Sequence, residues 1–166
     1  MSMTITRTKV IIPRRLPDIV SRERLLALLD DTLEYRLTLV AAPAGYGKTS
    51  LLVDMAHQVE YPVCWLALDP MDQDFQRFIH HFVAAVQLQF PSFGASTTAV
   101  LNSMAAGKVD MRQLVSVVVN DVFENISEHF ALVLDDYHLI DENEIINQFV
   151  SLFGQEMDEN CHLIIA

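Results

Sequence analysis

The sequence predicts an α/β protein in which a parallel sheet carries helices on both faces. Short, uniformly apolar runs alternate along the chain with segments of helical periodicity. Parallel neighbours need crossover connections, and this alternation supplies them. A chain of 166 residues that is 51% hydrophobic is also long enough for one domain with a substantial core.

The first twenty residues predict an extended arm. They are basic, and Pro13 and Pro17 keep the backbone out of helical geometry. A helix is expected from Ser21, a suitable N-cap, with an apolar face made by Leu25, Leu26, Leu29 and Leu33.

Four apolar runs follow that we interpret as strands, the first three buried on both faces: residues 37–42, 63–68, 131–136 and 162–166. Apolar residues at spacings of three and four predict helices over 75–86, 115–126 and 145–153. Residues 91–108 are small and polar, and we expect a loop there with a single helical turn.

Composition narrows the possible functions. Twenty-two acidic against eleven basic side chains give a net charge of −11, which repels nucleic-acid phosphates, so we expect no direct nucleic-acid binding by this segment. Cys64 and Cys161 lie in apolar runs without a Cys/His cluster. There is no signal-peptide pattern and no apolar stretch near the ~18 residues of a membrane span. A cytoplasmic protein without a membrane partner is expected.

The segment APAGYGKTS, residues 42–50, matches the phosphate-binding pattern [AG]xxxxGK[ST] between a predicted strand and a predicted helix. Gly45 and Gly47 allow backbone N–H groups to turn toward phosphates, and the helix start adds its positive dipole end. Lys48 would reach the β- and γ-phosphates, and Thr49 would present its hydroxyl to Mg²⁺. The alternative, a glycine turn with a chance GKT, does not account for the flanking strand and helix.

The run ALVLDD places Asp135 and Asp136 at the carboxyl end of a buried strand, where ligands bind in open α/β sheets. We expect Asp135 to hold Mg²⁺ through water, as a Walker B acid does. Asp136 could polarise the attacking water, and it is our catalytic candidate together with Lys48; the alternative is a turn or helix-capping role. Two adjacent acids favour an ATPase-type site over a small-molecule kinase.

Two further groups of residues are less decisive. Val20 could pack on the adenine ring while Arg22 meets the base or a phosphate; the alternative is ordinary packing at the start of the helix. His80, His81 and His138 lack carboxylate or cysteine partners at metal-ligand spacing, and we interpret them as structural.

Four segments together resemble the N-terminal ATPase module of the MalT-like STAND regulators, which are large bacterial signal-transducing ATPases. The resemblance runs from about residue 9 to the end of the chain and is carried by TKVIIPRRLPDIVSRERLL, APAGYGKTS, CWLALDPMDQDFQRF and LVLDDYHLI. It implies a three-layer P-loop NTPase fold with residues 1–20 as the arm and 21–166 as the nucleotide-binding domain. It also implies that strand 162–166 lies between strands 37–42 and 131–136, with the last strand of the sheet missing and the domain incomplete at its C-terminus.

The resemblance also implies ligands and roles. The cofactors are ATP or ADP with Mg²⁺; Asp135 and Thr49 serve the metal, and Asp136 the hydrolytic water. The other nucleotide contacts are Gly45, Tyr46, Gly47, Lys48, Ser50, Val20 and Arg22. In the full-length protein it implies slow hydrolysis, self-association and DNA binding by missing C-terminal domains, with negligible turnover in this segment. Two alternatives remain: a free-standing P-loop ATPase or small-molecule kinase, and an interaction module with a relic P-loop.

Overall fold

Four parallel strands form the centre of the fold. The protein is described here from a computed structural model that covers residues 4–104 and 110–166. The strands are β1 (Leu37–Leu39), β2 (Val63–Ala67), β3 (Phe130–Asp135) and β4 (Cys161–Ile165), and their order in the sheet is β1-β4-β3-β2. The predicted insertion of the last strand between the first and third is therefore confirmed.

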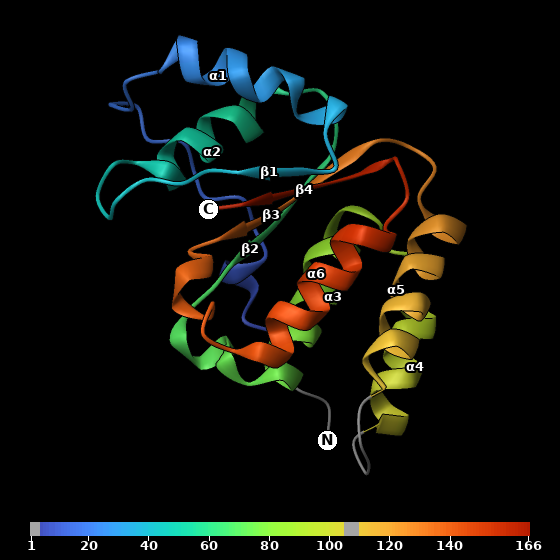
Figure 1. The fold of residues 1–166 in the computed structure, drawn as a ribbon. Helices are drawn as coiled ribbons and strands as arrows, with labels where there is room; N and C mark the ends of the chain where they lie inside the picture. The colour runs from blue at the N-terminus through green and yellow to red at the C-terminus, as the bar shows by residue number, and fades with distance from the viewer. Residues whose placement is uncertain (1–3, 105–109) are drawn as a thin grey trace.

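Helices cover both faces of this sheet, as Figure 1 shows. On one face lie α1 (Glu23–Asp30) and α2 (Lys48–Gln58). On the other lie α3 (Phe75–Gln89), α5 (Met111–Asn125) and α6 (Glu144–Glu156), with α4 (Ala95–Met104) packed on α5. Short 3-10 helices are η1 (Arg7–Lys9), η2 (Asp31–Glu34), η3 (Pro70–Gln73) and η4 (Tyr137–Leu139). The predicted α/β fold with three layers is confirmed.

Alternation along the strands divides the core into two parts. Trp65, Val133 and Ile164 face α1 and α2, whereas Leu66 and Leu132 face α3, α5 and α6. Because successive side chains of a strand enter both parts, every residue of β3 is buried, as are all residues of β2 and β4 except the last of each, and these runs read as largely apolar. Both cysteines are free and buried in this core, as their positions in apolar runs predicted.

An aromatic cluster lies between α3 and α6. The ring of Phe149 is fully buried, and its centroid lies 5.3 Å from that of Phe82, 5.9 Å from that of Phe78 and 6.0 Å from that of Phe153. The contacts with Phe78 and Phe82 are edge-to-face, the arrangement that aromatic quadrupoles favour. This cluster is the part of the core in which α6 is held against α3.

The first strand differs from the prediction. It is three residues long rather than six, because after Val40, whose N–H bonds to the carbonyl of Ile165 at 2.8 Å, the chain leaves the sheet. It is also not buried on both faces, since Leu37 is 47% and Leu39 65% exposed. The reason is its place at the edge of the sheet, where β4 is its only strand neighbour among the described residues.

Two local predictions were wrong. Ser21 does not cap the first helix, which begins at Glu23 with Arg22 at the N-cap, because the Ser21 hydroxyl donates instead to Asp54. Part of the expected loop 91–108 is the ten-residue helix α4, held by Thr97, whose N–H and hydroxyl donate to buried Asp121 at 2.9 and 2.8 Å. Residues 105–108 of that loop lie outside the described residues.

In the described ranges, no helix is both long and apolar enough to cross a membrane.

We predict that Phe149→Ala lowers the free energy of unfolding by about 3–5 kcal/mol, since it empties a fully enclosed aromatic site. Phe123→Ala is the matched control: the same atoms are removed from a side chain that is 70% exposed, and the change should stay within about 0.5 kcal/mol. Urea denaturation of the three proteins tests this. Equal losses in both variants would contradict the packing described for α3 and α6.

Candidate functional site

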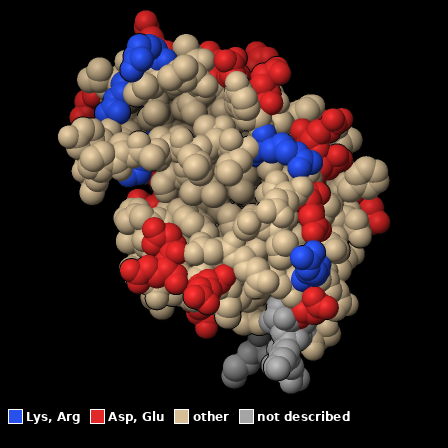
Figure 2. Space-filling view, viewed as in Figure 1, with Lys and Arg blue, Asp and Glu red and all other residues tan. Residues whose placement is uncertain are grey.

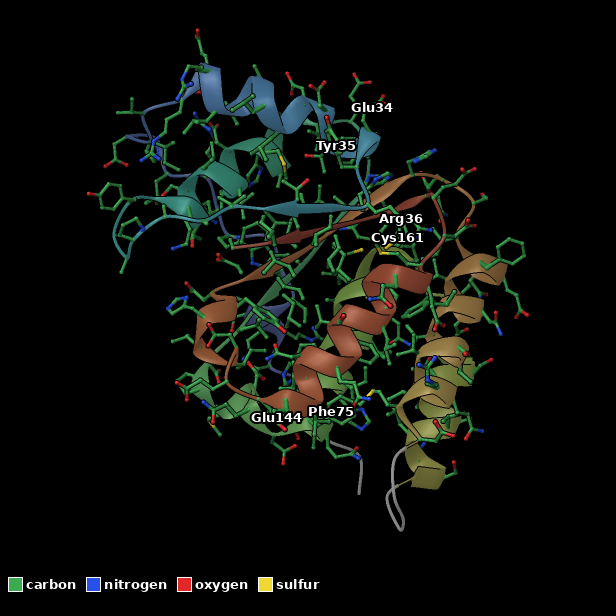
Figure 3. The ribbon with its side chains drawn as sticks, in the orientation of Figure 1. Glu34, Tyr35, Arg36, Phe75, Glu144 and Cys161 are labelled. Atoms are coloured by element: carbon green, nitrogen blue, oxygen red, sulfur yellow. The ribbon has the colours of Figure 1, made fainter. Side chains whose placement is uncertain are left out.

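The loop for which we predict phosphate binding, called the phosphate loop below, lies at the carboxyl edge of the sheet. It connects β1 to α2, and β3 ends at the same edge with Asp135. Figure 1 shows the loop at the end of the sheet where β4 also ends. Figure 3 places Arg36 and Cys161 together at the opposite end, where the strands begin. In open α/β sheets the carboxyl edge is the one that binds ligands.

Two glycines give the loop its shape. Gly45 and Gly47 have φ values of +82° and +75°, a left-handed conformation that other residues adopt at a cost. Gly47 is the residue before α2, so the first N–H groups of that helix are left without a capping side chain. A Cβ atom on Gly47 would come within 2.7 Å of Nη2 of Arg22. The loop therefore presents backbone donors at a helix start, the arrangement that binds anions.

Lys48, Thr49 and Asp135 converge beside this loop. The Lys48 ammonium donates to the carbonyl of Ala42 at 2.8 Å, across the loop. The Thr49 hydroxyl lies 3.0 Å from each carboxylate oxygen of Asp135, although the two residues are 86 positions apart in the sequence. The structure thus brings the predicted Mg²⁺ ligands into contact, while Asp136, the predicted catalytic acid, is the next residue along.

Asp135 is a carboxylate with little water. It is 2% exposed, and its burial raises the pKa of the side chain above the usual value of 3.8. The hydrogen bond from Thr49 acts in the opposite direction, and the negative charge of Asp136 adds to the rise. A desolvated carboxylate next to a hydroxyl is a pair of oxygen donors suited to a hard divalent cation. The residues present therefore fit Mg²⁺.

Asp136 has an unusual backbone. Its φ of +60° places it in the left-handed region, the one such non-glycine residue among those that the structure describes. It precedes η4, but its side chain forms no capping hydrogen bond there in the described structure. Strained residues of this kind concentrate at functional sites. Whether Asp136 acts on water is untested by the geometry and stays a prediction.

Because α1 begins only at Glu23, the arm extends to Arg22 in the structure, and it reaches the same loop. Nη1 of Arg22 donates to the carbonyl of Tyr46 at 2.8 Å, and the guanidinium covers Gly47. Val20 is 82% exposed and, with Arg22 and Ser50, lines a hollow of about 340 Å³ between the arm and α2. The side chain of Tyr46 is 64% exposed. All predicted nucleotide contacts therefore lie around one region of the surface, although Tyr46 points its ring toward solvent.

The histidines divide into two kinds. His81 is fully buried: its Nε2 accepts from the N–H of Thr6 at 3.1 Å, and its Nδ1 lies 2.9 Å from the carbonyl of Arg77. His138 is exposed and lines a second hollow of about 340 Å³ together with Lys48 and Asp141, so it lies nearer the phosphate loop than its sequence context indicated. In residues 4–104 and 110–166, no three His, Cys, Asp or Glu side chains are grouped to hold a metal by themselves.

Sequence reasoning missed Asp54 on α2. This acid is 2% exposed and accepts hydrogen bonds from Arg15 and Ser21 of the arm and from Gln58. One signal was available: Asp54 interrupts the apolar run LLVDMA in the helix after the phosphate loop. A charged residue at a core position of a helix is almost never buried without a partner.

Comparison with known proteins finds relatives over most of the chain. No family model matches the chain. The chain is 37% identical over 156 residues to the HTH-type transcriptional regulator MalT of Serratia proteamaculans, and 35% identical to the proteins of the same name from Yersinia pestis and Yersinia pseudotuberculosis. These matches cover 92% of the chain but 16% of each regulator. Over this shared region the predicted resemblance to MalT-like regulators is confirmed, and the chain is a homologue of proteins named HTH-type transcriptional regulator MalT.

Proposed function

We propose that this chain is the nucleotide-binding module of a signal-transducing ATPase switch in a bacterial transcriptional regulator. The observation that carries the proposal is the contact of Thr49 with buried Asp135 beside a glycine loop at the start of α2. Its relatives are named transcriptional regulators. The ligands that we propose are ATP or ADP with Mg²⁺.

The phosphates would lie against the loop. Backbone N–H groups at the start of α2 and the helix dipole attract anions there. The Lys48 ammonium, now bonded to the Ala42 carbonyl, is a mobile cation that would turn to the phosphates, while Ser50 follows on the exposed side of the helix. Val20 and Arg22 would contact the nucleoside end, where the arm faces α2.

Thr49 and Asp135 would hold the metal. Bound Mg²⁺ supplies positive charge to the phosphates and fixes their orientation. The contribution of the chain is a hydroxyl and a carboxylate already 3.0 Å apart, so little reorganisation is needed. Because the Asp135 carboxylate is shielded from water, its negative charge is costly to bury, and a cation bound beside it would offset that cost.

Asp136 would orient the hydrolytic water. Asp136 directly follows Asp135 on a left-handed backbone, and we expect its carboxylate to point in a different direction from that of the metal ligand. As a general base it would accept a proton from the water, a contribution typically worth ~10²–10⁴ in rate.

DNA binding is assigned to other parts of the regulator. Lys9, Arg15 and Arg77 are already paired with aspartates. On the face shown in Figure 2, the basic residues fall in a few small groups that do not join, so no continuous track for phosphates is present there. The chain spans about a sixth of its relatives' length. In our proposal the regulator acts in the cytoplasm, and its remaining domains respond to the nucleotide that this module holds. The response is self-association of the regulator and a change in its DNA binding.

We predict that Lys48→Ala weakens binding of Mg-ADP and Mg-ATP at least about ten-fold, since it removes the ammonium group that lies across the loop. Arg112→Ala makes the same charge change at an exposed residue of α5 and should have no effect. Titration calorimetry on folded proteins measures both. Equal affinity in the wild type and Lys48→Ala would remove the basis for the phosphate role.

Asp135→Asn should stabilise the nucleotide-free protein at neutral pH. The folded-state pKa of Asp135 is raised by burial, so the ionised carboxylate destabilises the fold above that pKa, and the penalty disappears as pH falls toward 3.8. The stability difference between variant and wild type should therefore shrink with acidification. Denaturant unfolding at neutral and acidic pH measures the difference in unfolding free energy between variant and wild type. A variant that is less stable at both pH values would show that burial of the ionised carboxylate does not destabilise the fold.

Asp136→Asn in the full-length regulator should slow single-turnover ATP hydrolysis by ~10²-fold or more while ATP affinity changes little. Asparagine tolerates the left-handed backbone as aspartate does, so the variant removes the charge without adding strain. Asp141→Asn, which changes a nearby exposed acid, is the control. Hydrolysis at the wild-type rate would leave Asp136 with a structural role only.

A further inference from the structure

Asp54 connects the helix of the phosphate loop to the arm. Its Oδ1 accepts from Nε of Arg15 at 2.6 Å and from Nε2 of Gln58 at 2.9 Å, and its Oδ2 accepts from the hydroxyl of Ser21 at 2.8 Å. Two of these three donors belong to the arm. The Arg15 hydrogen bond contributes most to a pKa of Asp54 below its usual value, so the carboxylate is ionised at neutral pH.

This contact lies on the same face of α2 as the phosphate loop. Gly47, Ser50, Leu51 and Asp54 are spaced three and four residues apart and therefore follow one side of the helix. They line one side of the hollow of about 340 Å³, and residues 16–22 of the arm supply the other side. The hollow thus begins at the phosphate loop and continues along α2 to Asp54.

Few other contacts determine where residues 16–22 lie. Farther along the arm, Lys9 is anchored to Asp69 and Asp72, and the carbonyl of Pro13 lies 3.0 Å from Nε2 of His57. At its other end Arg22 bonds to the loop itself. Between these anchors, the two bonds to Asp54 are the polar contacts that fix the distance of the arm from α2 within the described structure.

We propose that Asp54 is a positioning residue for the nucleoside end of the ligand. Through Arg15 and Ser21 it holds arm residues 16–22 over α2, and so sets the width of the hollow that receives the base and ribose. It does not contact the phosphates. The inference rests on the proposed nucleotide binding and adds to it a determinant of affinity that lies nearly two helical turns beyond the start of α2.

The test separates the nucleoside end from the phosphate end. Arg15→Met should weaken Mg-ADP binding by about ten-fold, the change expected for loss of one charge-assisted hydrogen bond, and should leave binding of inorganic tripolyphosphate unchanged. Arg14→Met is the matched control: it removes the same charge one residue away, from an exposed side chain that forms no hydrogen bond or ion pair within the described residues. It should alter neither affinity.

A second variant keeps the experiment decisive. Asp54→Asn should reproduce the selective loss of ADP affinity, and adding Arg15→Met to it should cause no further loss, because both changes break one contact. An equal loss for ADP and tripolyphosphate would overturn the proposal, as Arg15 would then act on the phosphates or on folding. Unchanged ADP affinity in both variants would overturn it too. If the wild type binds neither ligand, the proposed function itself fails.

Discussion

The contact between the Thr49 hydroxyl and the Asp135 carboxylate joins the two halves of the site, and the arrangement of the sheet makes it possible. The loop follows β1 and Asp135 ends β3, yet β4 lies between these strands. The loop must therefore bend back over the edge of β4 before α2 begins, which is why left-handed glycines stand at 45 and 47. Once α2 packs against Trp65, Val133 and Ile164, its first turn ends beside β3. The packing of α2 on the core therefore also determines the position of Thr49 relative to Asp135.

Much of the fold could be predicted because its signals are local. The inner strands are contiguous apolar runs, and the glycine loop and the paired acids each lie within a few residues of sequence. Where the information is distant, prediction failed. Helix α4 depends on Asp121, which is 24 residues beyond Thr97, and its own small residues carry little helical period. The exposure of β1 depends on which strand lies at the edge, and an apolar run alone does not show this.

The candidate site shows the same division. The residues that touch phosphate or metal in our proposal follow a motif with fixed spacing and were identified by position. Asp54 and Arg15 belong to no motif, and their partnership spans 39 residues. His138 lies beside Lys48 only because β3 and the loop end at one edge of the sheet. The geometry of the fold, more than any pattern in the chain, determines which side chains surround the motif.

The arm packs against both layers of helices and against β2, the strand at one side of the sheet. Val10 joins the core on the α3 side, whereas Ile12 packs with the core on the α2 side, and η1 lies against β2, the edge strand opposite β1. The Lys9 ammonium lies against Asp72, which has no exposed surface. For recombinant expression, the safe starting point is therefore ahead of Thr6 and not at residue 21. A shorter version would leave a buried aspartate without its lysine and bare the backbone of β2 to association with other chains.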